Sequence, residues 1–380
     1  MKNNNENKIL NVPNLRFPEF SGEWENCQIA NILSIGSGRD YKHLEKGNIP
    51  VFGTGGYMTS VNECIYDGET TFIGRKGSIN KPFYYNGKFW TVDTLFYTHS
   101  FNKTTPKFVY CLFQTINWLR YNEASGVPSL SKDTIEKIKV FIPQLDEQRK
   151  ISEMLSVIDE RIATQNKIIE KLQSLIRGLS DNIHRDIKGE TVCFSGVGEA
   201  YSGLSGKSGD DFGDGEPFIT YMNVYQNTYI SEKDYEFVQI APNERQNCVQ
   251  YGDALFTLSS ETPEEVGIGA VYLGNTQKLY LNSFCFGIHF YDDRVLPQYL
   301  AHFISSFSFR KAIYPLAQGS TRFNLQKNDF MKMKFVLPTL EEQERIAKTL
   351  DALHYCMANE KSLLEQYILL KRYLLSQMFI

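Results

Sequence analysis

The sequence predicts an α+β fold in which two β-leaning globular parts are joined by two long helices that pair as an antiparallel coiled coil. Three observations indicate this fold: an internal repeat, a heptad pattern at the end of each repeat, and short apolar runs between turns. Similarity at a fixed offset means that one structural unit occurs twice. We therefore expect a globular part over 1–143, a helix over 144–184, a second globular part over 185–337 and a second helix over 338–380, with a disordered polar tail at 1–11.

The repeat is clearest where each long helix begins. The segment PQLDEQRKISEML, from Pro143, aligns without gaps with PTLEEQERIAKTL, from Pro338, at an offset of 195 residues. Upstream, Ser125, Leu130 and Lys139 match Ser320, Leu325 and Lys334. The chain is therefore a tandem of two modules, each a globular part followed by a helix.

Both helix segments carry apolar residues at intervals of three and four. A stripe of this period over more than four heptads is typical of a coiled coil. A single helix with one bare apolar stripe is not stable alone. The other helix of the same chain has a matching length and is the partner we expect, although a coil between two chains is the alternative. The stripe positions are Ile151, Leu155, Ile158, Ile162, Ile169, Leu172, Ile176, Leu179 and Ile183, then Ile346, Leu350, Leu353, Met357, Leu364, Tyr367, Lys371, Leu374 and Met378. Polar Gln165 and Glu360 fill one equivalent position in each stripe, and Lys371 is the charged member of the second.

The globular parts share an order of elements more than they share residues. Short runs such as NIPVFG, TTFIG and PFYYN in the first part, and EPFITYMNVY, DALFTLS and FCFGIHFY in the second, predict strands. A helical stretch follows in each, PKFVYCLFQTINWL or PQYLAHFISSF, and then a loop, NEASGVPSLS or AQGSTRFNLQ. The two parts therefore look like one scaffold that carries different residues in each copy.

Composition excludes several classes of protein. No apolar run is long enough to span a membrane, and the first eleven residues lack the apolar stretch of a secretory signal, so we expect a cytoplasmic protein. The seven scattered cysteines and six histidines show no metal-ligand spacing, which predicts neither disulfides nor a metal site. The net charge is −4, with +3 over 1–143 and −5 over 185–337. Phosphate attraction alone would hold DNA poorly, so DNA binding would need a basic partner or contacts to base edges.

Catalytic motifs are incomplete. FGTGG at Phe52 has the wrong spacing for a cofactor loop, NKPF at Asn80 lacks a proline of the methyltransferase N-P-P-F motif, and GKS at Gly206 lacks the first glycine of a phosphate-binding loop. We therefore predict no catalytic residues.

The ordered set of motifs resembles the specificity subunits of type I restriction–modification systems. The resemblance covers nearly the whole chain: VPNLRFPEFSGEWE from Val12, P-x-L-x-E-Q-x-x-I at Pro143 and Pro338, and YSGLSGKSGDDFGDGEPFITYMNVY from Tyr201. It implies that 1–143 and 185–337 are target recognition domains, each reading one half of a split site in double-stranded DNA. It implies as partners two copies of an adenine methyltransferase subunit and a translocase–endonuclease subunit, which would use S-adenosylmethionine, ATP and Mg, while this chain binds no cofactor and no membrane. The second module lacks a clear copy of the R-F-P-E-F…G-E-W opening.

Base readout needs side chains that pair with base edges from exposed loops, such as Arg with guanine and Asn or Gln with adenine. On this ground we predict DNA contacts in both domains. Ser129 aligns with Asn324 and is a weaker candidate. The predicted residues are Arg39, Lys42, Tyr57, Arg75, Lys76 and Lys81 in the first domain, and Lys207, Tyr221, Asn223, Tyr225, Arg322 and Asn324 in the second.

Two other functions remain open from the sequence. The chain could be a scaffold that binds other proteins through two β-rich modules, and DNA binding that depends on a methyltransferase partner would distinguish the two. A self-contained methyltransferase is disfavoured by the incomplete motifs, and methyl transfer by the purified chain alone would support it.

Overall fold

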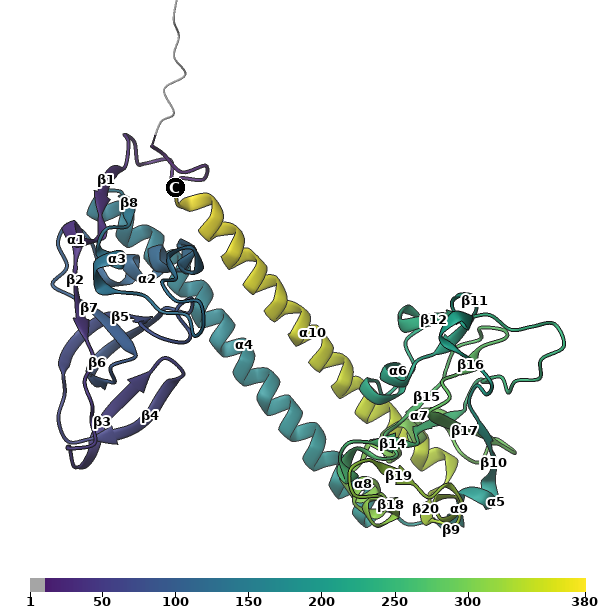
Figure 1. Cartoon of the computed structure of the whole chain (residues 1–380). Helices are drawn as coiled ribbons and strands as arrows, with labels where there is room; N and C mark the ends of the chain where they lie inside the picture. Colours follow the sequence, from purple (N-terminus) through teal and green to yellow (C-terminus); the bar gives the residue numbers. More distant parts are fainter. Residues whose placement is uncertain (1–10) are drawn as a thin grey trace, which may run out of the picture. The chain divides into compact units, whose positions relative to one another are not determined.

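Two long helices each contribute to both packing units of the computed structural model, which describes residues 11–380 (Figure 1). Helix α4 spans Leu145–Asp186 and helix α10 spans Leu340–Met378. Unit 1 comprises the chain up to Asn166 together with Ser362–Ile380, and unit 2 comprises Lys167–Lys361. The packing units therefore cut across the linear order of the repeats. Apart from Asn11, the predicted disordered tail lies outside the described residues.

Opposite halves of the two helices meet in each unit. In unit 1 the first half of α4 shares a core with the last turns of α10, and the Lys371 ammonium donates to Asp159 at 2.5 Å. In unit 2 the last turns of α4 share a core with the first turns of α10. The predicted antiparallel pairing within one chain is therefore confirmed. The core residues concerned are Ile151, Leu155, Ile158, Leu374 and Met378 in unit 1, and Leu179, Ile183, Ile346 and Leu350 in unit 2.

The glutamine of the repeated helix-start motif explains why the motif recurs. Gln148 and Gln343 are both fully buried in the first turn of their helices. Gln148 donates to the carbonyl of Lys103 at 2.8 Å, and Gln343 donates to the carbonyl of Arg294 at 2.8 Å. Each amide thus joins a long helix to the chain just before the short helix of its globular part. A buried amide stabilises a fold only when its hydrogen bonds are made, which restricts both positions to glutamine.

Unit 1 contains a six-stranded sheet in the order β2-β7-β5-β6-β3-β4 and a two-stranded ribbon β1-β8. Its helices pack on this framework, and one core cluster joins them to the long-helix pair. The bounds are β1 Glu25–Gln28, α1 Ile29–Ile32, β2 Ser34–Ser37, β3 Lys46–Gly53, β4 Gly56–Val61, β5 Tyr66–Gly74, β6 Phe83–Thr91, β7 Leu95–His99, α2 Pro106–Thr115, η1 Trp118–Tyr121, α3 Lys132–Glu136 and β8 Lys139–Ile142.

Unit 2 contains a four-stranded sheet β10-β17-β13-β15, two three-stranded sheets, β12-β11-β16 and β14-β19-β18, and the ribbon β20-β9. The bounds are β9 Glu190–Cys193, α5 Phe194–Val197, β10 Gly198–Ser202, η2 Gly209–Asp211, β11 Phe212–Ile219, α6 Tyr221–Gln226, η3 Glu232–Asp234, β12 Tyr235–Val238, β13 Ala254–Thr257, β14 Ser259–Ser260, η4 Pro263–Glu265, β15 Gly269–Val271, β16 Tyr280–Leu281, β17 Cys285–Phe290, α7 Pro297–Ser305, α8 Phe307–Ile313, η5 Tyr314–Leu316, β18 Ala317–Gln318, β19 Phe323–Leu325, α9 Lys327–Met331 and β20 Lys334–Leu337.

Strand pairing shows that the two units repeat one plan. The ribbon before each long helix is antiparallel, and its paired residues include Lys139 in unit 1 and Lys334 in unit 2, which also match in the sequence repeat. The sheets agree as well, since β2-β7-β5 corresponds to β10-β17-β13. The α+β fold with two globular parts of one design is therefore confirmed.

Local predictions were less accurate. The run EPFITYMNVY was predicted as one strand, but the chain leaves β11 at Ile219 and forms helix α6, which Thr220 caps by accepting from the Asn223 amide. The predicted loop AQGSTRFNLQ contains the hairpin of β18 and β19. Period-two alternation cannot distinguish a strand from one helical turn in so short a run. Across the described residues, no helix combines the length and apolar character needed to cross a membrane.

Candidate nucleic-acid interface

The turn between β6 and β7 is the point where loops of unit 1 meet. The backbone amide of Arg75 donates to the carbonyl of Thr94 at 2.8 Å, and the amide of Arg39 donates to the carbonyl of Thr91 at 2.8 Å. A Cβ atom at Gly38 would lie 2.0 Å from the Val92 carbonyl oxygen, so only glycine allows this close approach. The structure therefore brings the loops that carry Arg39 and Arg75 together.

A hollow of about 780 Å³ lies between these loops and the β3–β4 hairpin. Lys42, Met58 and Asp93 are among the residues that line it. Tyr57, on the same hairpin, is 64% exposed. Five of the six residues predicted in this domain thus lie around one end of the sheet, in the loops that join its strands. Exposed cationic and aromatic side chains are available to a ligand there.

Arg75 and Lys76 are held at this end of the sheet by several contacts. The Arg75 guanidinium lies 5.9 Å from the centroid of the Phe96 ring and donates to the Asp93 carbonyl at 3.3 Å. Lys76 forms a backbone bridge to Ser129. The loop that contains Ser129 is therefore held beside the two basic residues.

Lys81 lies elsewhere in unit 1. It lines a separate groove of about 410 Å³ together with Gln114 of α2 and Lys371 and Arg372 of α10. This groove runs beside the long helix, and the structure does not bring Lys81 together with Arg39 and Arg75.

In unit 2 a corresponding cluster forms around β14 and β19. The exposed Arg322 guanidinium lies 5.7 Å from the ring centroid of Phe284, which is 54% exposed. Asn324 pairs with Ser259 in the sheet, and the Tyr221 hydroxyl donates to the Ser259 carbonyl at 2.8 Å. Arg322, Asn324 and Tyr221 therefore share one small region of the surface.

Tyr225 extends this region through a hydrogen-bonded carboxylate. Its ring stacks on Tyr221 at 6.0 Å, and its hydroxyl donates to Glu265 at 2.7 Å. This hydrogen bond raises the pKa of Tyr225 and lowers that of Glu265, while burial raises the pKa of Tyr221. Both phenols therefore remain protonated at neutral pH, and the hydroxyl of Tyr225 is used within the protein.

Arg310 is a residue of this region that the sequence analysis missed. Its guanidinium donates to the carbonyls of Gly267 at 2.5 Å, Val266 at 2.7 Å and Glu264 at 2.8 Å. It therefore holds the loop before β15 in shape, beside Glu265. An arginine in a helical FSFRKAI segment gives no sequence signal for such a role.

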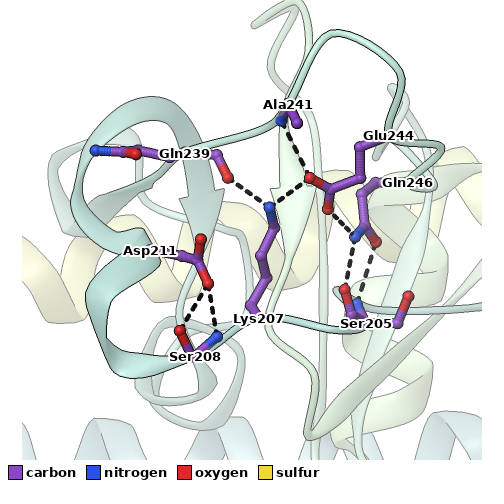
Figure 2. A network of polar contacts seen from close by, with 8 residues as sticks. All are labelled: Ser205, Lys207, Ser208, Asp211, Gln239, Ala241, Glu244 and Gln246. Carbon is purple, nitrogen blue, oxygen red and sulfur yellow. Dashed lines mark hydrogen bonds and ion pairs between the residues drawn. The ribbon is translucent and has the colours of Figure 1, made fainter.

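Lys207 lies outside the cluster, in a loop network shown in Figure 2. Its ammonium donates to the Gln239 carbonyl at 2.6 Å and pairs with Glu244 at 2.5 Å, and its side chain is only 7% exposed. Ser205 and Gln246 exchange two further hydrogen bonds across the same loops (Figure 2). The lysine therefore joins two loops of unit 2, and its charge is already compensated.

Asn223 also has a structural environment. It is 2% exposed, its side chain donates to the carbonyl of Ser231 at 2.8 Å, and it accepts from the Ser231 amide at 3.0 Å. These bonds join α6 to the segment before η3. Lys207 thus lies away from the Arg322 cluster, whereas Asn223 lies between Tyr221 and Tyr225 on α6 but is buried and bonded within the protein.

The two clusters occupy equivalent positions in their units. In unit 1 the Leu130 amide donates to the Arg75 carbonyl at 2.8 Å, and in unit 2 the Leu325 amide donates to the Leu258 carbonyl at 2.8 Å. Leu130 and Leu325 match in the sequence repeat. The bridge between Lys76 and Ser129 consequently corresponds to the pairing of Ser259 with Asn324. One place on the shared scaffold therefore carries a different polar set in each unit.

The side chains of both clusters suit recognition through hydrogen bonds. They offer guanidinium, ammonium, amide and phenol groups, which donate and accept hydrogen bonds. Among residues 11–380 no group of three or more His, Cys, Asp or Glu side chains has the geometry to hold a metal ion.

Comparison with known proteins places these features in a family. The model of the family described as type I restriction modification DNA specificity domain matches residues 21–174 and 190–367. A putative type I restriction enzyme specificity subunit of Haemophilus influenzae is 22% identical over 367 residues, covering 87% of this chain and 86% of that protein. The MjaVIII specificity subunit of Methanocaldococcus jannaschii is 24% identical over 273 residues, 64% of this chain and 62% of that protein.

Solved structures agree on the fold. The S subunit of a type I restriction-modification system from M. genitalium has a TM-score of 0.64 and 13% identity, covering 97% of this chain and 99% of that chain. A chain described in work on complex assembly and conformational transition of the type I R-M system has a TM-score of 0.57 and 15% identity, covering 93% and 97%. The two family matches divide the sequence as the internal repeat does, and together they cover most of it. The chain belongs to the type I restriction modification DNA specificity domain family, as a type I specificity subunit.

Proposed function

We propose that this chain reads a bipartite site in double-stranded DNA, one half with each recognition domain, and directs adenine methylation and restriction by partner subunits. The observation that carries the proposal is the pair of equivalent clusters, around Arg75 in unit 1 and around Arg322 in unit 2. Two domains that read different half-sites on one scaffold need different side chains at the same position. The Lys76–Ser129 pair of unit 1 and the equivalent Ser259–Asn324 pair of unit 2 have this arrangement.

The proposed readout depends on base edges more than on phosphate attraction. Residues 185–337 carry a net charge of −5, and Lys207 is already paired with Glu244. Arg322 is the exposed cation of the second cluster, and an arginine that contacts guanine discriminates by about 1–3 kcal/mol. Because so little charge is free here, the partner subunits would supply most of the phosphate contacts.

The chain itself would perform no chemistry. We propose that two copies of an adenine methyltransferase subunit and a translocase–endonuclease subunit act in the cytoplasm, using S-adenosylmethionine, ATP and Mg, while this chain binds no cofactor. Each unit contains about half of α4 and about half of α10, which supports the docking of two copies of one partner.

Sequencing that detects N6-methyladenine tests the proposal. The methyltransferase subunit is expressed with the wild-type chain, with an Arg322→Ala variant and without the chain. We expect a split methylated motif that appears only when the chain is present. We expect the Arg322→Ala variant to lose specificity in only one half of this motif. If the folded, bound partner methylates no new motif, or methylates the same motif without the chain, the proposal is wrong.

A further inference from the structure

A pocket of about 410 Å³ lies at the opposite end of β13 from the Arg322 cluster. Asp253, which lines it, directly precedes β13, whereas Ser259 of the cluster is the second residue after that strand. The exposed end of the sheet at Tyr251 therefore forms a second surface of unit 2 that the candidate DNA interface does not use.

The floor of this pocket is an Asp–His pair. The Asp253 carboxylate is 3% exposed and accepts from Tyr201 at 2.7 Å and from the Gln250 amide at 2.8 Å. Nδ1 of His289 lies 2.7 Å from the same carboxylate, and the ring stacks on Tyr201 at 4.2 Å. A carboxylate on Nδ1 selects the tautomer that carries its proton there. In the neutral ring, Nε2 is then a hydrogen-bond acceptor that has no partner among residues 11–380.

The rim is aromatic and acidic. Tyr251 and Tyr291 line the pocket and are 60% and 61% exposed. Asp292 is already paired with Arg294 at 3.0 Å, but Asp293, also on the rim, has no ion pair in the described part of the chain. Tyrosine faces attract cations, and a carboxylate beside them adds to that attraction. The same groups repel phosphate, so this surface suits a cationic group and not DNA.

Unit 1 lacks this rim. The carbonyls of Lys103 and Arg294 accept equivalent hydrogen bonds from the two helix-start glutamines, so these residues occupy equivalent positions. Counting back, Ser100–Asn102 of unit 1 stands where Tyr291–Asp293 stands in unit 2. A ligand of the rim would therefore distinguish the two otherwise similar units.

We propose that this pocket binds the guanidinium or ammonium group of an arginine or lysine side chain of a partner protein, and that it does so in unit 2 only. His289 and Asp293 accept the hydrogen bonds of the cation, and Tyr251 and Tyr291 cover its apolar stem. The charge of −5 over residues 185–337 favours a basic partner segment. The site marks one of the two units for a partner, and its existence does not depend on DNA reading.

The test uses the full chain with labelled histidines and the probe peptide acetyl-Gly-Gly-Arg-Gly-Gly-amide. We expect a saturable NMR shift at His289, about tenfold weaker affinity for the peptide with neutral citrulline in place of arginine, and a similar loss in the variant Tyr291→Ser/Asp293→Asn. The variant carries the residues of unit 1 at two exposed positions. A control variant with the same two changes elsewhere in unit 2, Tyr355→Ser/Asp214→Asn, should bind as the wild type does.

Three results would overturn the proposal. They are no shift at His289, equal affinity for the citrulline peptide, and full binding by the pocket variant. Spermidine is titrated in parallel, because tighter binding of this free polyamine than of the peptide would show that the pocket takes a small cation and not a partner side chain.

Discussion

Substitution of Glu147 by glutamine should destabilise unit 1 much more than the equivalent change should destabilise unit 2. The Glu147 carboxylate is 2% exposed and accepts two hydrogen bonds from Arg16, at 2.8 and 2.7 Å, and one from Trp24 at 3.3 Å. These contacts fasten the segment before β1 to the start of α4. The Trp24 ring also packs against Phe379, the residue after α10, so the same segment reaches both long helices.

The magnitude follows from burial. The variant keeps the shape of the side chain but leaves the Arg16 guanidinium, which is 16% exposed, without its countercharge. Removing one partner of a buried ion pair costs about 3 kcal/mol or more. With a urea m-value of about 2 kcal/mol/M, the midpoint of unit 1 should fall by about 1.5 M. All three tryptophans, at positions 24, 90 and 118, lie in unit 1, so tryptophan fluorescence follows its unfolding selectively.

Glu342 provides a matched control because it occupies the same place in the repeat. Its carboxylate pairs with Arg345, whose side chain is 70% exposed, on the open face of α10. Exposed pairs of this kind contribute little to stability. Glu342→Gln should therefore leave the midpoint of unit 2, followed by circular dichroism, close to that of the wild type. If Glu147→Gln shifts its unit no more than the control shifts unit 2, the buried pair does not have the role that we assign to it.

Three further predictions follow. Arg322→Met should change one half of the methylated motif, and an unchanged motif would exclude Arg322 from base reading. The salt dependence of DNA binding should fall, by about one counterion, only if Arg322 also contacts a phosphate. Lys207→Met should leave both the motif and the salt dependence unaltered but increase hydrogen exchange in the loops of Figure 2, because its ammonium compensates Glu244; an altered motif would show that the lysine contacts DNA after all. The stability of unit 2 should fall as the pH falls below about 6.5, because burial lowers the pKa values of His184, His302 and His354 in the folded state. As the pH falls, the unfolded chain therefore binds protons at these histidines before the folded chain does. Urea midpoints that do not change between pH 7.5 and 5.5 would contradict this prediction.

The sequence predicted the large features of the fold because they depend on periodic patterns. The helix predicted over 144–184 spans Leu145–Asp186, since the heptad stripe defines it locally. The repeat also predicted that both units share one plan, because identical residues such as Lys139 and Lys334 lie in matching ribbons. Strand β19 was missed because it pairs with β14, where Phe323 lies opposite Ser260, 63 residues earlier in the chain, and no local pattern reports such a contact.

Site residues were harder to predict for the same reason. Arg75 and Arg39 meet only because both loops bind the turn that follows β6, which is a tertiary contact. Lys207 and Arg322 looked alike as basic residues in glycine-containing loops. Whether a lysine in such a loop is exposed depends on what the neighbouring loop provides, and here Glu244 and the Gln239 carbonyl come from a segment more than 30 residues later.

The two units differ most at the positions where a partner protein or a DNA half-site would distinguish one unit from the other. The cores and the buried helix-start glutamines are shared, which suits equal docking of two identical partners. The bridges differ, with Lys76 and Ser129 in one unit and Ser259 and Asn324 in the other, as the proposed reading of two different half-sites requires. The rim at Tyr291 occurs in unit 2 alone, at the far end of β13 from the bridge. A change at the rim should therefore alter which partner engages the chain without altering the DNA sequence that is methylated, whereas a change at the bridge should do the reverse.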